Sequence, residues 1–228
     1  AVDSGLGWQG KLPKDSNKYQ DLRAIGYLYG APAQLVVRAD SKFKTAFDLK
    51  GARVAVGNAG SGAAASAERF FRHIGLWDKF KPTFMGYSAA ASAFKDKNRS
   101  VIEASVQVKI RLIDVGADAE KSGFYKAYAY APVTIPAGTY GKGMPPCKTF
   151  QDSTILSVNK NVSEEVVYNV AKALWSKKGM AAMVAAKKTF KAMTLENGFR
   201  GASVPLHPGA VKFWKEQGKK IPDNLMPK

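Results

Sequence analysis

Small and hydroxyl-bearing residues gather between a short β-rich run and a helical pattern. Glycine stands at positions 57, 60 and 62, with Ser61 among them, and we call residues 57–62 the glycine turn. Glycine permits backbone angles that other residues avoid. The first N–H groups of a helix have no partner within the helix and carry the positive end of its dipole. Such a turn can bind an anion, although taken alone it is more typical of an ordinary α/β connection.

Few other residues offer catalytic or metal chemistry. Cys147 is the single cysteine, so the chain can form neither an internal disulfide nor a cysteine cage for a metal. His73 and His207 are the two histidines, and neither has the spacing of a metal ligand nor stands beside a nucleophile. We interpret His73 as a surface residue. The sequence therefore predicts no enzyme, no metal site and no cofactor.

An alternation of strand-like and helix-like segments positions the glycine turn. Residues 53–57 are typical of a strand, and apolar residues at 67, 70, 71 and 74 follow with helical spacing. Residues 81–87 and 88–97 repeat this order, with Ser88 as the expected helix cap. Alternation of this kind predicts a parallel, doubly wound sheet.

The remaining segments are less regular. We expect a loop over residues 1–21, and two strands over 22–29 and 34–38 that pass from one sheet to another because no helix separates them. Further strands are expected at 110–115 and 154–158, and further helices after Ser163, over 180–193 and from Pro208. The alternation breaks near residues 97–100.

The net charge of the chain suggests a second class of function. Thirty-five basic and eighteen acidic residues give a net charge of +17, which favours anionic partners. The basic residues fall singly or in pairs, such as Lys177 with Lys178 and Lys187 with Lys188, a pattern more typical of a solvated surface than of a groove for phosphates. A basic protein that binds nucleic acid or an anionic surface stays as the alternative. No apolar run is long enough to span a membrane, and no signal peptide is visible.

Five segments in order resemble the TAXI type of solute-binding protein, the receptor subunit of tripartite TRAP transporters. They are residues 22–41, 48–62, 134–140, 166–175 and 204–210. The resemblance implies a two-lobed, periplasmic-binding-protein-like α/β fold of type II, each lobe a mostly parallel sheet flanked by helices. Lobe one would comprise residues 1–38 and 154–228 and lobe two residues 39–153, with 34–38 and 154–158 as crossing strands. His207 would belong to a structural motif of the tail.

The resemblance also implies a function without catalysis. The protein would capture a small carboxylate, such as a glutamate-like amino acid or another organic anion, in the periplasm and deliver it to TRAP membrane subunits. The ligand-binding residues would be Tyr27, Tyr29, Asn58, Gly60, Ser61, Gly62 and Ala63. The sequence departs from the family in three ways: the opening strand, turn and helix of lobe one are absent, a segment near 97–100 is missing, and Ala63 stands where a threonine is usual.

Overall fold

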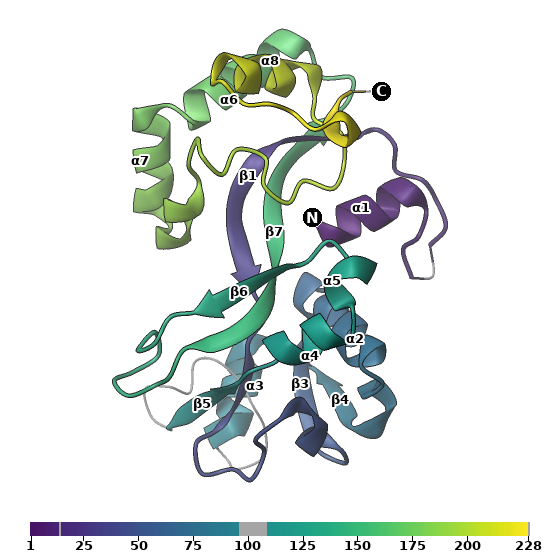
Figure 1. Cartoon of the computed structure of the whole chain (residues 1–228), viewed down its shortest axis with the longest axis vertical. Coiled ribbons are helices and arrows are strands. Elements are labelled where there is room, and N and C mark those ends of the chain that lie inside the picture. Colours follow the sequence, from purple (N-terminus) through teal and green to yellow (C-terminus); the bar gives the residue numbers. More distant parts are fainter. Residues whose placement is uncertain (14, 96–108, 228) are drawn as a thin grey trace. The chain divides into compact units, whose positions relative to one another are not determined.

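The computed structural model describes residues 1–13, 15–95 and 109–227, so the predicted break near residues 97–100 lies outside the described part (Figure 1). Helices and strands are mixed throughout, which confirms the α/β class. The chain forms two compact units: unit 1 is Ala1–Ala31 with Asp152–Lys228, and unit 2 is Pro32–Gln151. The lobe boundaries at 38/39 and 153/154 stay a prediction, and each unit is described by itself.

Unit 1 begins with a helix where we expected a loop. Its elements are α1 (Val2–Gln9), most of β1 (Leu22–Pro32), the second part of β7 (Cys147–Asn159), α6 (Glu164–Leu174), α7 (Lys177–Ala186), the 3-10 helix η4 (Lys188–Ala192), α8 (Pro208–Glu216) and the 3-10 helix η5 (Asp223–Leu225). The loop prediction was wrong for residues 2–9, whose glycines pack closely: a Cβ on Gly5 would lie 2.8 Å from Cβ of Ser203. The amino group of Ala1 also pairs with Asp152 at 3.1 Å.

Two tryptophans, Trp175 and Trp214, lie at the centre of the core of unit 1. Trp214 is fully buried, its Nε1 donates a hydrogen bond to the Ile25 carbonyl at 2.8 Å, and its ring meets Trp175 edge-on. Helix α8 starts at Pro208, as predicted, and is capped by His207, whose Nδ1 accepts from the Gly209 amide at 3.2 Å. His207 is only 1% exposed, so it holds the helix start in the core.

Unit 2 contains the glycine turn. Its elements are β2 (Leu35–Arg38), η1 (Ala46–Leu49), β3 (Arg53–Gly57), α2 (Gly62–His73), η2 (Trp77–Lys79), β4 (Lys81–Phe84), α3 (Tyr87–Lys95), β5 (Ile110–Ile113), α4 (Gly116–Lys121), α5 (Phe124–Ala127), β6 (Ala131–Ile135) and the start of β7. Helices α4 and α5 were not predicted. Strands β1 and β2 do lie in different sheets, as expected.

The sheets are more mixed than the mostly parallel ones that the resemblance implied. Strands β3 and β4 are parallel, but β2 pairs with β5 antiparallel and β6 pairs with β7 antiparallel. A short connection, residues 136–146, joins β6 directly to β7, and two strands joined without a crossover element pair antiparallel. The parallel β3–β4 pair is the part of unit 2 that positions the candidate site.

A buried network fixes α2 against the segment between α5 and β6. The Arg69 side chain, 8% exposed, donates from Nη1 to the Tyr130 hydroxyl at 2.6 Å, and this hydroxyl donates to Oγ of Ser66 at 2.9 Å. The ring of Tyr130 stacks on the fully buried ring of Phe124 with centroids 4.8 Å apart. Polar and apolar contacts together hold the helix whose N-terminus forms the site.

Candidate functional site

The candidate site lies where two parallel strands end together. Arg53 pairs with Lys81 at the start of β3 and β4, and Gly57 pairs with Phe84 at their end. The Met85 amide donates to the Gly57 carbonyl at 2.9 Å, which holds the two strand ends together. Helix α2 follows the first strand and α3 the second. The carboxyl end of parallel strands is the edge where α/β proteins place their ligands.

The glycine turn adopts the predicted strand–turn–helix path. Gly57 and Gly60 have φ values of 107° and 75°, in the region that side chains disfavour. A Cβ on Gly57 would also lie 3.1 Å from Oγ of Ser61, so a side chain there would press on the start of α2. The Ser61 amide donates to the Asn58 carbonyl at 3.0 Å, which closes the turn. Glycine at 57 and 60 is therefore required by the backbone path.

The first turn of α2 presents unused donors. Ser61 is the N-cap, and its Oγ accepts from the Ala64 amide at 3.2 Å, while its carbonyl accepts from the Ala65 amide. No residue in the described part of the chain accepts a hydrogen bond from the amides of Gly62 and Ala63, and both residues are exposed. The Ser61 hydroxyl proton is likewise free to donate. Three donors thus meet at the positive end of a helix.

The neighbouring helix adds residues that the sequence did not single out. A Cβ on Gly86 would lie 3.2 Å from Oδ1 of Asn58, so the glycine lets the Asn58 side chain lie against the start of α3. Phe84 is 48% exposed and Tyr87 55% exposed beside this contact. Helix α3 begins at Tyr87, so the prediction that Ser88 caps it was wrong. The repeated strand–helix order of residues 81–97 was the sequence pattern from which the residues at the end of β4 could have been predicted as part of the site.

The two predicted tyrosines lie in unit 1. Tyr27 is 3% exposed, its amide donates to the Gly198 carbonyl at 2.7 Å, and burial raises the pKa of its hydroxyl, an effect partly offset by the Arg200 charge. Tyr29 is half-buried: Nζ of Lys187 lies 4.8 Å from its ring centre, and its ring contacts Phe190 edge-on. The structure brings Asn58, Gly60, Ser61, Gly62 and Ala63 together in unit 2. A contribution of the tyrosines to the same site stays a prediction.

Comparison with known proteins places the chain in a family. The model of the NMT1-like family matches residues 5–218. The chain belongs to the NMT1-like family. Solved structures resemble it more distantly. One is the periplasmic aliphatic sulphonate binding protein SsuA from Escherichia coli, with 17% identity over 87% of this chain and 67% of that one and a TM-score of 0.41. Another is a TctC solute binding protein from Polaromonas, with 18% identity over 86% of this chain and 66% of that one and a TM-score of 0.46. A third is the alkanesulfonate-binding protein SsuA from Xanthomonas axonopodis pv. citri, with 17% identity over 91% of this chain and 71% of that one and a TM-score of 0.39.

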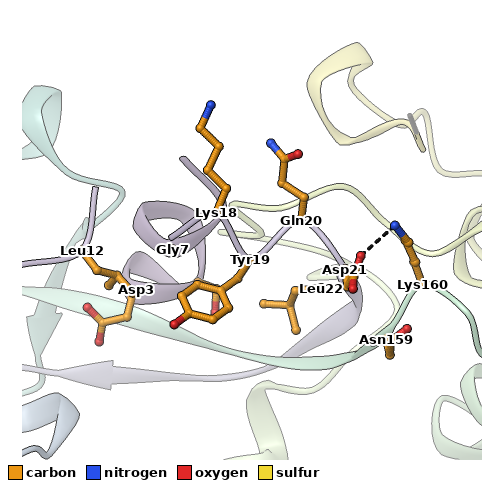
Figure 2. Close-up of a pocket in the computed structure, with 11 residues that line it drawn as sticks. Asp3, Gly7, Leu12, Lys18, Tyr19, Gln20, Asp21, Leu22, Asn159 and Lys160 are labelled. Carbon is orange, nitrogen blue, oxygen red and sulfur yellow. Dashed lines mark ion pairs between the residues drawn. The ribbon is translucent and has the colours of Figure 1, made fainter. Parts of the chain in front are cut away.

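A pocket lies in unit 1 of the NMT1-like chain (Figure 2). This pocket of about 640 Å³ lies between the N-terminal segment and the end of β7. Asp21 and Lys160 form an ion pair of 2.7 Å at its side, and both are well exposed. Acidic and basic residues line it together, Asp3 and Asp21 with Lys18 and Lys160. Its charges largely cancel, so the glycine turn is the stronger candidate for an anion.

The thiol of Cys147 and the imidazole of His73 have structural roles. Cys147 is 6% exposed, and burial raises the pKa of its thiol to about 11, which keeps it protonated at neutral pH. Nε2 of His73 lies 2.9 Å from the Ser122 carbonyl, and the His73 ring contacts Phe124. Within residues 1–13, 15–95 and 109–227, no group of three His, Cys, Asp or Glu side chains is placed to hold a metal ion, and no helix has the length and apolarity to cross a membrane.

Proposed function

We propose that this NMT1-like protein is a solute-binding protein that captures a small organic carboxylate and delivers it to the membrane subunits of a TRAP transporter. The observation that carries the proposal is the exposed pair of amides at Gly62 and Ala63 beside the Ser61 hydroxyl. The five segments that resemble TAXI-type receptors, spread in order along the chain, support the TRAP partner and a periplasmic location.

The site would act by binding alone. A carboxylate would accept hydrogen bonds from the two amides and from the Ser61 hydroxyl, and the Asn58 side-chain amide would donate a further one. Hydrogen bonds to a charged group contribute about 1.5–3 kcal/mol each. Tyr29 would close the other side when the lobes move together, with Tyr27 supporting it from its buried position in unit 1, and closure would exclude water. No bond is made or broken in the solute.

Calorimetry with a panel of small anions tests the proposal. The purified protein is titrated with glutamate, other amino acids and simple dicarboxylates, and with a sulfonate as a different anion. One-site binding of a carboxylate is the expected result. Absence of heat with every carboxylate would overturn the proposal, and so would tighter binding of the sulfonate than of any carboxylate.

A matched pair of serines locates the site. Ser61 caps α2 and Ser163 caps α6, and their Oγ atoms accept from backbone amides at 3.2 and 3.3 Å. Replacing either serine by alanine removes one helix cap, which costs about 1 kcal/mol of folding stability. Only Ser61→Ala should also weaken carboxylate binding, by roughly tenfold or more. Equal weakening by Ser163→Ala would show that the loss reflects helix stability.

A further inference from the structure

Helix α7 in unit 1 has an unusual surface for its composition. Eight of its ten residues are Gly, Met, Ala or Val, yet none of its side chains is buried. The half-buried residues are Gly179, Met180, Met183 and Val184. The exposed side carries Lys178, Ala181, Ala182 and Ala185 at positions i, i+3, i+4 and i+7, which lie on one face of a helix.

Exposed lysines lie on this helix and on the segments next to it in sequence, with no acidic residue among them. Residues 166–195 contain six exposed lysines and neither aspartate nor glutamate: Lys172, Lys177, Lys178, Lys187, Lys188 and Lys191. We call these six lysines, with the exposed alanines of α7, the lysine surface; α7 is labelled in Figure 1. Lys177 and Lys178 stand in the first turn of α7, where the helix dipole disfavours a cation. Their placement therefore does not serve the stability of the helix.

We propose that the lysine surface binds the headgroups of an anionic phospholipid bilayer. Protein–protein interfaces are depleted in lysine and enriched in arginine and aromatic residues, and this surface has the opposite composition. Lysine is a strongly hydrated point charge, suited to a diffuse anionic surface. Each lysine near such a surface contributes about fivefold in affinity. The small alanines between the charges let the helix lie flat against the headgroups.

Composition also argues against nucleic acid as the partner. Proteins that bind single strands combine basic grooves with exposed aromatic side chains on which bases stack. Within residues 166–195, all of which the structure describes, no aromatic side chain is exposed. The proposal is tested apart from the solute site: the glycine turn lies in unit 2 and the lysine surface in unit 1, and Lys187, which contacts the ring of Tyr29, is not among the lysines replaced below. Membrane attachment would concentrate the protein where a transporter is found.

Vesicle sedimentation with two matched variants tests the proposal. The first variant replaces Lys177, Lys178, Lys188 and Lys191 by glutamine; all four side chains are exposed. The control replaces four exposed lysines of unit 2 by glutamine: Lys42, Lys44, Lys79 and Lys81. Both variants remove four of the same kind of charge from a net charge of +17. Circular dichroism verifies that both are folded.

The native protein should sediment with vesicles of phosphatidylcholine and phosphatidylglycerol, but not with phosphatidylcholine alone. The lysine-surface variant should bind at least tenfold more weakly, and the control less than about threefold more weakly. Equal loss in both variants would assign the binding to total charge and overturn the proposal. Failure of the native protein to bind, or binding to a purified acidic transporter subunit without binding to vesicles, would also overturn it.

Substitutions at one exposed position test independently whether positive charge on the lysine surface raises the affinity for anionic vesicles. Ala185→Lys adds a positive charge in the middle of the lysine surface, and Ala185→Glu adds a negative one. Both residues favour helices, so neither change should unfold α7. Affinity for phosphatidylglycerol vesicles should rise about fivefold in the first variant and fall about fivefold in the second. Changes in the same direction, or no change in either, would contradict the proposed contact.

Discussion

Replacing Gly62 by aspartate should make the protein more stable and its solute site weaker. Gly62 is the first residue of α2, a Cβ there would meet nothing within 4 Å, and the first turn contains no acidic residue. Removing a glycine from a helix contributes about 0.5–1 kcal/mol, and an acidic residue in the first turn contributes about 0.3–1 kcal/mol through the helix dipole. The free energy of unfolding should therefore rise by about 1–2 kcal/mol.

The same carboxylate should repel the solute. Two like charges about 4 Å apart interact by about 4 kcal/mol at an effective dielectric constant of 20. The affinity for a carboxylate should fall at least a hundredfold, which calorimetry measures, while urea unfolding measures the stability. Gly62→Asn has nearly the same shape without the charge, so it should keep affinity within about tenfold of the native protein.

The two readouts move in opposite directions, so a general disturbance of the fold cannot imitate the result. A Gly62→Asp variant that binds the carboxylate as tightly as the native protein would refute the placement of the anion at these amides. A variant that is less stable than the native protein would refute the claim that the position is open to a side chain.

Three further predictions test how the structure is held together. Tyr130→Phe leaves Arg69 and Ser66 without the hydroxyl that joins them and should lower the free energy of unfolding by about 1–3 kcal/mol in urea; a loss below about 0.5 kcal/mol would contradict this. Gly209→Ala would place a Cβ 2.2 Å from the Glu164 carbonyl oxygen and should cost about 1–3 kcal/mol, seen as a lower melting temperature; an unchanged one would argue against close packing of α8 on α6. Because burial raises the pKa of Cys147 from 9.0 to about 11, the unfolded state loses the thiol proton first, and stability should fall as pH rises between these values. Cys147→Ala should show less of that fall.

The parts that could be predicted from sequence are those whose causes are local. Valines at 54 and 56, glycines in the turn and apolar residues at helical spacing together specify strand, turn and helix within about twenty residues. Ser163 and Pro208 likewise mark helix starts through chemistry that acts within one turn. Five of the predicted site residues, 58 and 60–63, follow directly from that local pattern.

The parts that could not be predicted depend on distant contacts. Helix α1 is rich in glycine and forms because Gly5 packs on Ser203, nearly two hundred residues away in sequence. Tyr27 looked available as a strand residue, yet it is buried beside Gly198 and Arg200. Phe84 and Tyr87 become candidate site residues only because the β3–β4 pairing brings the end of β4 beside the glycine turn. Hydrophobic periodicity does not contain this information.

Ala63 determines what kind of selectivity the turn itself can provide. The resemblance to TAXI-type receptors implies a threonine at this position, and the alanine found here offers no hydroxyl at the start of α2. The remaining donors are mainly backbone amides, which attract negative charge but distinguish poorly between one small anion and another. Discrimination then has to come from side chains around the turn, and exposed side chains at the same edge include Asn58, Phe84, Tyr87 and Ser88. For the anion proposed above, exposed aromatic rings at this edge predict a preference for an anion with an apolar body over a compact one that is charged throughout.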